Sequence, residues 1–365
     1  MAIKPRILIL TDINSPHTQK WVDSLLKDNF KIGIFSFNSC NTNKYKDESN
    51  ITVLHQAKSF SNGSFLSKMS YFFLFPKLLV SILKFKPNVI HAHYASSYGF
   101  VGALTFFKPF IVSAWGSDVM VFPKKNFLQK KMLNFVLWRA DKICVTSSLL
   151  KEELEKYTSK EAYIIPFGVN LNLFYSKRDA DNSKIFVFGC TKFLEKIYNI
   201  DRVVLAFNLL VKKYPNLDLK LKLVGSGSEQ KNIESLINLH NLNSRIEMVG
   251  RVSHDKIPDY LNSLDVLVNV SENESFGVSV AEAMACEIPV IVSNASGFKD
   301  LIPNETVGLI AKSTSVDDIF VAMETYLLNN ELRFLHAKNA HERINLLFNW
   351  KNSVSKMEDL YLDYL

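Results

Sequence analysis

Short apolar runs alternate with longer helical patterns along this chain of 365 residues, and the alternation occurs twice. In the first half, the expected strands are 7–10, 32–37, 89–93, 110–114 and 142–147, and the expected helices are 20–28, 65–85, 126–139 and 148–157. In the second half, the expected strands are 185–189, 219–224, 246–249, 266–270 and 289–293. Strands separated by helices form parallel sheets covered on both faces. The sequence therefore predicts an α/β fold with two doubly wound, Rossmann-like domains facing each other across a cleft.

A segment rich in proline, glycine and polar residues separates the two halves at 164–183 and is typical of a linker. The apolar content of 47% is sufficient for two cores. We expect a first domain over 1–170 and a second over 171–345. A final helix over 345–365 is expected to pack back on the first domain.

Positive charge is concentrated in the first half. Residues 1–170 carry 22 Lys/Arg against 11 Asp/Glu, whereas residues 171–365 carry 21 against 25. Between residues 49 and 140, Asp118 is the only acid, against eleven Lys/Arg. The stretch 65–87 adds phenylalanine, leucine and tyrosine among lysines. This pattern favours an anionic membrane surface as a partner. The alternatives are a buried helix with snorkelling lysines and, less favoured, nucleic-acid binding.

The four cysteines, Cys40, Cys144, Cys190 and Cys286, have no spacing typical of zinc or a disulfide framework. No uncharged apolar stretch reaches the length of about 18 residues that a spanning helix needs. The apolar run at 7–10 is too short for a signal peptide. We therefore expect a cytoplasmic protein, peripheral at the inner face of the membrane.

Two glutamates, Glu274 and Glu282, lie eight positions apart in the run 271–290, which reads as a strand end, a turn at Gly277 and a helix. Open α/β sheets bind ligands at that edge. The start of a helix offers unpaired N–H groups to a phosphate, and carboxylates accept hydrogen bonds from sugar hydroxyls. The alternative is a surface helix with two solvated acids.

Two further strand ends in the second half carry candidate ligand groups. Gly225 and Gly227 follow the strand 219–224, where glycine permits close approach of a ligand, although any strand-to-helix turn favours glycine. Lys192 and Lys196 follow the strand 185–189, where they are either diphosphate ligands or solvated loop lysines.

Polar residues also follow three strands of the first half. Asn14 and His17 follow the first strand, His93 ends another, and Trp115 and Asp118 follow a third. Their convergence on one edge predicts a second ligand site. A metal site built from His17, His91 and His93 is the alternative, but their spacing does not support it, and we expect no metal.

With these motifs in order, the chain resembles the retaining family-4 glycosyltransferases of the GT-B fold. The resemblance covers most of the chain and is most specific in the second half. It rests on residues 194–201, the Val-Gly-Ser-Gly-Ser-Glu turn at 224–229, Gly250-Arg-Val, the run 274–285, Pro289-Val and Ser296-Gly297.

The resemblance implies roles for these residues. Glu282 would hold the ribose, Glu274 would hold the donor sugar near the chemistry, and Arg251 and Val252 would lie beside the base. The other implied donor-binding residues are Lys192, Lys196, Gly225, Gly227, Ser275, Phe276, Gly277 and Val278. The implied acceptor-side residues are Asn14, His17, His93 and Asp118.

One departure from the family concerns catalysis. Trp115 stands where many relatives have a histidine, so its backbone carbonyl, not an imidazole, would meet the donor sugar. The catalytic candidates are Glu274, His17 and Trp115. The resemblance implies no metal and no cofactor, with the nucleotide sugar as a co-substrate. Lysines and a helix start would stabilise the leaving group instead.

The predicted function is transfer of a sugar with retention, from a nucleotide diphosphate sugar, UDP-sugar favoured, to a glycan or lipid-linked acceptor. Bacterial cell-surface polysaccharide synthesis is the expected setting. The alternatives are a nucleotide-sugar epimerase of the same architecture and a non-catalytic sugar-nucleotide-binding protein.

Overall fold

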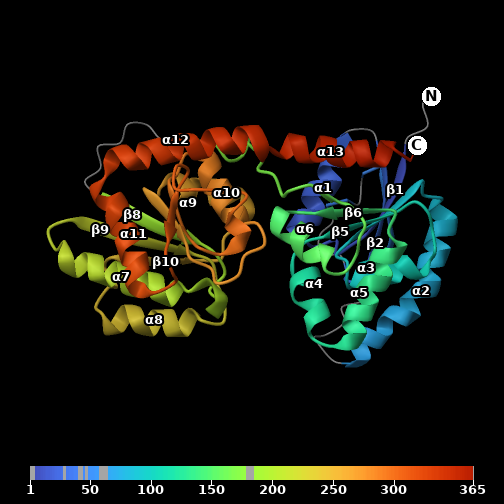
Figure 1. Cartoon of the computed structure of the whole chain (residues 1–365), viewed down its shortest axis with the longest axis horizontal. Coiled ribbons are helices and arrows are strands. Elements are labelled where there is room, and N and C mark those ends of the chain that lie inside the picture. The colour runs from blue at the N-terminus through green and yellow to red at the C-terminus, as the bar shows by residue number, and fades with distance from the viewer. Residues whose placement is uncertain are drawn as a thin grey trace. The chain divides into compact units, whose positions relative to one another are not determined.

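The computed structural model describes residues 5–27, 30–39, 44–45, 48–56, 65–177 and 185–364, and over 65–73 it describes the backbone alone. The chain divides into a first domain, residues 1–166 and 353–365, and a second domain, residues 167–352 (Figure 1). The expected boundary lay at residue 170, and the expected linker falls partly on 178–184, outside the described residues.

The first domain is built on a parallel sheet of seven strands in the order β3-β2-β1-β4-β5-β6-β7. The strands are β1 Arg6–Leu10, β2 Lys31–Ser36, β3 Ile51–Gln56, β4 Val89–His93, β5 Phe110–Ala114, β6 Lys142–Val145 and β7 Ala162–Ile164. The helices are α1 Pro16–Lys27, α2 Phe65–Phe85, α3 Ser97–Leu104, α4 Ser117–Met120, η1 Phe122–Lys124, α5 Phe127–Arg139, α6 Ser148–Glu155 and the terminal α13 Trp350–Leu362, which begins in the second domain.

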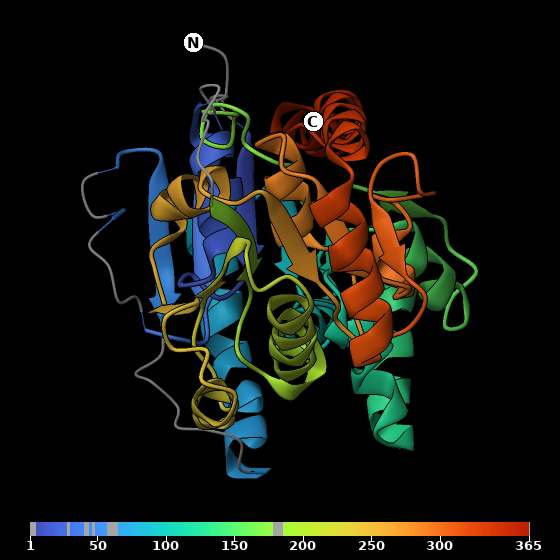
Figure 2. The ribbon, with the colours of Figure 1, turned by 90° about the vertical axis from the view of Figure 1, so that its left-hand side faces the viewer.

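The second domain repeats this architecture with six parallel strands in the order β10-β9-β8-β11-β12-β13. The strands are β8 Ile185–Thr191, β9 Asp218–Val224, β10 Ile246–Gly250, β11 Val266–Asn269, β12 Val290–Ser293 and β13 Leu309–Ala311. The helices are η2 Lys196–Tyr198, α7 Ile200–Lys213, α8 Gln230–Leu239, η3 His254–Lys256, α9 Ile257–Asn262, α10 Val278–Ala285, η4 Ser296–Phe298, α11 Val316–Leu328 and α12 Asn330–Leu347. Helices α7 and α11 lie side by side (Figure 2).

Burial explains why the central strands are readable from the sequence. Every residue of β4, β5, β11 and β12 is buried, as expected for parallel strands covered on both faces. The prediction of two doubly wound parallel sheets is confirmed. Strands β3, β7 and β13 and helix α3 were not predicted. Two of these strands have only three residues, too few to show a period.

Both sheets reverse their strand order at the centre, between β1 and β4 in the first domain and between β8 and β11 in the second. The crossovers on the two sides of such a point leave the sheet in opposite directions. This opens a crevice at the carboxyl ends of the two strands, where ligands bind. The fold therefore provides one candidate site in each domain.

The terminal helix α13 is anchored to the first sheet by a buried polar contact. The Tyr361 hydroxyl shares a hydrogen bond of 2.6 Å with Nδ1 of His91, and Nε2 of His91 shares one of 2.8 Å with the Ser113 hydroxyl. The rings of Tyr361 and Phe30 also meet edge to face. Both ring nitrogens of His91 are therefore paired although the side chain is fully buried.

None of the helices in the described part of the chain has the length and apolar character that crossing a membrane requires.

Burial of His91 predicts a loss of stability in acid. Burial lowers its pKa to about 3, below the usual value of 6.5. Because the unfolded chain takes up the proton first, this stability is complete above about pH 6.5 and is lost as the pH falls toward 3. Between pH 7 and pH 5, His91 should cost about 2 kcal/mol of the free energy of unfolding.

Urea unfolding at both pH values, followed by circular dichroism, measures this difference. His91→Asn should reduce the pH-dependent loss whatever its effect at pH 7. An equal loss in the variant and the native chain would contradict the assignment.

Candidate functional site

At the centre of the second sheet, Lys192 and Glu274 form a nearly buried ion pair. Lys192 follows β8 and Glu274 lies in the loop after β11, the two strands at which the order reverses. The Lys192 Nζ lies 2.6 Å from Glu274 Oε2, and the side chains are only 14% and 12% exposed. The ring of Tyr198 lies under the ammonium group, 4.6 Å from its centroid. Two predicted donor residues thus meet where the fold favours a ligand.

Glu282 lies in the second half of α10 and is paired with a histidine that the sequence analysis did not include. The Nε2 of His254, in η3, lies 2.6 Å from Glu282 Oε1. The carboxylate side chain is 9% exposed, and the imidazole is 53% exposed and packs near the Phe174 ring. A ligand hydroxyl can therefore reach this carboxylate by displacing an exposed ring.

Helix α10 begins shortly after Glu274 in the sequence and has no capping side chain. Its N-cap is Gly277, whose φ of +95° is a left-handed conformation that glycine adopts without strain. The first N–H groups of the helix are then available to an anion. Ser275 and Val278, which flank the turn, are half-buried, whereas the Phe276 side chain is buried in the core.

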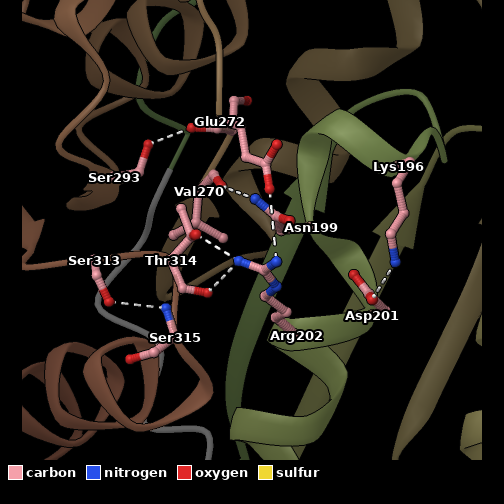
Figure 3. Close-up of polar contacts among 11 residues, drawn as sticks. Lys196, Asn199, Asp201, Arg202, Val270, Glu272, Ser293, Ser313, Thr314 and Ser315 are labelled. Atoms are coloured by element: carbon pink, nitrogen blue, oxygen red, sulfur yellow. Dashed lines mark hydrogen bonds and ion pairs between the residues drawn. The ribbon is translucent and has the colours of Figure 1, made fainter.

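The loop that carries Glu274 is held by close backbone packing. A Cβ added to Gly297 would lie 2.0 Å from the Glu274 carbonyl oxygen. The Ser293 hydroxyl donates to the Ser271 carbonyl, and the Asn199 side chain donates to the Val270 carbonyl (Figure 3). The position of the Glu274 carboxylate is thus set by glycine packing and backbone hydrogen bonds from neighbouring elements.

Lys196 is not part of the Lys192–Glu274 pair. It is 69% exposed, and its Nζ lies 3.2 Å from Asp201 Oδ2, toward which it points in Figure 3. Lys196 begins η2, and its partner Asp201 lies in the first turn of α7, beyond the left-handed Asn199. In the same region Arg202 bonds Thr314 and lies 3.6 Å from Glu272.

Gly225 and Gly227 lie against the loop that carries Lys192. A Cβ on Gly225 would stand 1.9 Å from the Lys192 carbonyl oxygen, and one on Gly227 would stand 2.3 Å from the Leu194 carbonyl oxygen. The glycines therefore allow two backbone segments to approach closely, which is sufficient reason for their presence.

Arg251 and Val252 follow β10, at the outer side of the same sheet edge. The Arg251 side chain is exposed and Val252 is half-buried. Their expected position beside a base stays a prediction.

The first domain has a pocket of about 480 Å³ at the carboxyl ends of β1, β2, β4 and β5. It holds three of the predicted residues, His17, His93 and Trp115. The other lining residues are Thr11, Asp12, Ser15, Phe37, Asn38, Tyr94, Ser97 and Tyr98. The prediction that polar residues from several strand ends converge here agrees with this geometry.

Aromatic rings form much of this pocket. The Trp115 ring lies 4.7 Å from the His93 ring and 5.9 Å from the His17 ring. Nδ1 of His93 shares a hydrogen bond of 3.1 Å with the Thr11 hydroxyl. Burial lowers the pKa of His93 well below its usual value, and the neighbouring His91 and His17 act in the same direction. His93 is therefore a neutral hydrogen-bonding group at physiological pH.

Asp118 and Asn14 flank the pocket and do not line it. The fully buried Asp118 carboxylate accepts backbone N–H groups from Ala95 at 2.7 Å, Gly116 at 2.8 Å and Trp115 at 3.1 Å. Burial raises its pKa, although these donors act in the opposite direction. Asp118 thus joins the loops after β4 and β5, and Asn14 donates to the Ser39 carbonyl. Both positions support the pocket from outside.

Sequence reasoning missed Asp12, Tyr94 and Tyr98 in the first domain and Tyr198 and His254 in the second. All but Tyr198 and Tyr98 directly follow a strand or the turn after one, so a systematic reading of strand ends could have found them. Tyr98 and Tyr198 are brought in by helical turns. Of the residues that the structure describes, no three His, Cys, Asp or Glu side chains are grouped to hold a metal.

Two family models match the chain, one in each domain. Residues 6–147 match the model described as Glycosyl transferase 4-like, and residues 174–343 match the one described as Glycosyl transferases group 1. An uncharacterised glycosyltransferase of Methanocaldococcus jannaschii is 27% identical over 346 residues, which cover 92% of this chain and 90% of that protein. The N-acetyl-alpha-D-glucosaminyl L-malate synthase of Bacillus anthracis is 25% identical over 297 residues, 76% of this chain and 75% of that protein.

Solved structures show the same fold. Sucrose-phosphate synthase from Thermosynechococcus elongatus superposes with a TM-score of 0.78 at 22% identity, over 99% of each chain. The Anabaena protein Alr3699/HepE, solved with UDP and glucose, gives 0.77 at 18% identity, over 98% of this chain and 99% of that one. The predicted GT-B architecture of two Rossmann-like domains is therefore confirmed.

The glycine at the Lys192 loop provides a sharp test of this geometry. Gly225→Ala should displace the Lys192 backbone, because the added Cβ would overlap its carbonyl oxygen. Gly250→Ala is the matched control, since Gly250 also has positive φ but a Cβ there would meet no atom within 4 Å. The control should cost about 1–2 kcal/mol of backbone strain.

Gly225→Ala should lower the free energy of unfolding by about 3 kcal/mol or more, a greater loss than in Gly250→Ala. Urea unfolding of both variants measures the difference. Equal behaviour of the two variants would show that the close approach is not required.

Proposed function

We propose that this chain, which carries a glycosyl transferase 4-like domain and a glycosyl transferases group 1 domain, transfers a sugar from a nucleotide diphosphate sugar, UDP-sugar favoured, to a glycan or lipid-linked acceptor. The observation that carries the proposal is the Lys192–Glu274 pair beside the uncapped start of α10. A cation and a helix start suit a diphosphate, and a carboxylate suits the hydroxyls of a sugar.

Glu282 is the proposed anchor of the nucleotide. Its carboxylate would accept the ribose hydroxyls in place of the contact with His254, which is exposed and can rotate away. In the free protein, His254 holds the carboxylate ready and keeps it hydrogen-bonded. The anchor is then pre-organised, which reduces the cost of ordering it when the nucleotide binds.

In the proposed reaction, an acceptor hydroxyl oxygen forms a bond to the anomeric carbon on the face that the diphosphate leaves. The bond between that carbon and the phosphate oxygen breaks, and its electron pair stays on the diphosphate. The acceptor proton passes to the diphosphate oxygen, so the products are the glycoside and a nucleoside diphosphate with one proton. The new bond forms on the face of the old one, so the configuration is retained.

The chain's own groups would favour this transition state in two ways. Lys192 and the N–H groups at the start of α10 stabilise the charge that develops on the diphosphate. Glu274 faces the sugar, where it stabilises the positive charge of an oxocarbenium-like ring. These groups would supply the leaving-group stabilisation that a metal provides elsewhere, so the proposal includes no metal. The first-domain pocket, with His17 and Trp115, would take the acceptor.

We place this activity in cell-surface polysaccharide synthesis, at an anionic membrane to which the protein binds from the cytoplasm. Among the described residues of 74–138, the exposed charged side chains are all cationic: Lys77, Lys84, Lys86, Lys108, Lys124, Lys125, Lys130 and Lys131. Exposed apolar side chains accompany them on α2, α5 and the adjoining loops: Leu79, Val80, Leu83, Phe106, Val121, Phe127, Leu128 and Trp138. Helices α2 and α5 both pack on α3 (Figure 1).

This basic apolar surface has the two properties that membrane attachment needs. Exposed aromatic and aliphatic side chains enter the interface, and lysines are attracted to anionic headgroups. The sequence placed the attachment on 65–87, of which 65–73 are described by backbone alone. The exposed Phe127, Leu128 and Trp138 extend the surface to α5.

The two glutamates should separate binding from turnover. Glu282→Gln should weaken binding of UDP-sugar about tenfold, because a charged hydrogen-bond acceptor for the ribose is lost. Glu274→Gln should instead lower kcat about 100-fold with a smaller effect on binding. Lys196→Met should change both by less than about twofold, because this lysine faces solvent.

Titration calorimetry with the nucleotide sugar gives the dissociation constant, and a product assay by mass spectrometry gives kcat. Equal and negligible effects of the two glutamate variants would refute the donor site. A large effect of Lys196→Met would restore the role that the sequence suggested. An isomerised donor formed without acceptor would identify an epimerase.

Membrane attachment should depend on the apolar residues at the start of α5. Phe127→Ser with Leu128→Ser should release the protein from vesicles that contain phosphatidylglycerol, because each side chain contributes about 1–2 kcal/mol when buried in the interface. The matched control is Phe334→Ser with Leu335→Ser, an equally adjacent and exposed Phe-Leu pair on α12.

Co-sedimentation at low and moderate salt measures the bound fraction. The control pair should bind as the native chain does, and raising the salt should weaken both. Absence of binding to anionic vesicles at moderate salt would contradict membrane attachment.

A further inference from the structure

We propose that the first-domain pocket takes an uncharged sugar as the acceptor and excludes acceptors whose reacting end carries a phosphate or a carboxylate. The inference rests on the glycosyltransferase function proposed above and specifies the acceptor class of that site. It is drawn from the chemistry of the pocket walls.

Aromatic rings and neutral polar groups both line the pocket. The rings of Phe37 and Tyr98 stack at 4.1 Å with planes 16° apart, and Trp115 and Tyr94 contribute half-buried rings. A pyranose has the same division, since its C–H groups form apolar faces and its hydroxyls form a polar rim. Aromatic faces with a few placed hydrogen-bonding groups therefore suit it.

The hydrogen-bonding groups of the pocket carry almost no charge. Ser15, Asn38 and Ser97 supply hydroxyl and amide groups, which can donate to and accept from sugar hydroxyls. Of the lining residues that the structure describes, Asp12 alone is an acid, and none is a lysine or an arginine. The Asp12 Oδ1 accepts the backbone N–H of Asn14 at 3.0 Å, which fixes the Asp12 carboxylate near the end of β1.

An anionic acceptor would be disfavoured for two reasons. A phosphate or carboxylate that leaves water is best compensated by a fixed cation, and the described lining contains no lysine or arginine. It would also meet the Asp12 carboxylate, whose charge repels it. A neutral hydroxyl, in contrast, can donate to Asp12 without either cost.

The lack of lysine and arginine is a property of the pocket and not of the domain. Residues 1–170 carry twice as many basic as acidic residues, 22 against 11. The exposed lysines of α2 and α5, such as Lys84, Lys130 and Lys131, belong to the basic apolar surface and none of them lines the pocket. The domain thus separates a surface suited to anions from a pocket suited to a neutral ligand.

Saturation-transfer NMR on the full chain tests the inference without donor or turnover. The neutral probes are the methyl glycosides of glucose, galactose, N-acetylglucosamine and rhamnose. The anionic probes are glucose 6-phosphate, glucuronate and L-malate. We expect signals from at least one neutral glycoside and none from the anions at equal millimolar concentration. Trp115→Ala should weaken that binding about tenfold, whereas Trp115→Phe, which keeps a ring face, should preserve most of it.

Trp138→Ala is the matched control, because Trp138 is an exposed tryptophan of the same domain on α5 and does not line the pocket. It should bind as the native chain does. Ser97→Lys, which adds a cation to the lining, should bring glucose 6-phosphate into the pocket.

Binding of the anionic probes in preference to the glycosides, or binding of neither class, would overturn the inference. So would loss of glycoside binding in Trp138→Ala with binding retained in Trp115→Ala. UDP binding to the second domain, measured separately, keeps the two proposals distinct. UDP binding with anionic acceptors would refute the acceptor class alone, and glycoside binding with no nucleotide binding would refute the proposed function.

Discussion

The reversal of strand order at the centre of each parallel sheet is the constraint from which the candidate sites follow. Parallel strands end at one edge, and the crossovers on the two sides of β1 and of β8 leave in opposite directions. Each sheet must then present loops around an opening, and the side chains of those loops are brought together regardless of their distance in sequence. Lys192 and Glu274 are 82 residues apart and form an ion pair for this reason.

The same constraint determined how far the sequence could be interpreted. Buried central strands such as β4 and β5 have continuous apolar runs, so their bounds were predicted residue for residue. Position alone was sufficient to place residues at or after strand ends on a sheet edge, namely His17, His93, Trp115 and Lys192. The sequence could not show in which direction each of these side chains points. Lys192 and Lys196 are four residues apart, yet Lys192, directly after β8, pairs with Glu274, whereas Lys196, at the start of η2, pairs with Asp201.

Side-chain direction also explains why some site residues were missed and why others lie elsewhere than the sequence predicted. Asp118 follows a strand as a ligand group would, but three backbone N–H groups draw its carboxylate into the core. His254 lies after β10 and becomes a partner of Glu282 only because η3 turns back toward α10. Side-chain hydrogen bonds of this kind depend on loop conformation, and loop conformation has no simple periodic signal in a single sequence.

The central claim is that the second domain binds a nucleotide diphosphate at the start of α10. A crystal structure of the chain with UDP tests it most directly. The account predicts ribose hydroxyls on the Glu282 carboxylate with His254 displaced, and phosphate oxygens on Lys192 and on the first N–H groups after Gly277. A nucleotide bound elsewhere, with the His254–Glu282 and Lys192–Glu274 pairs unchanged, would contradict the account.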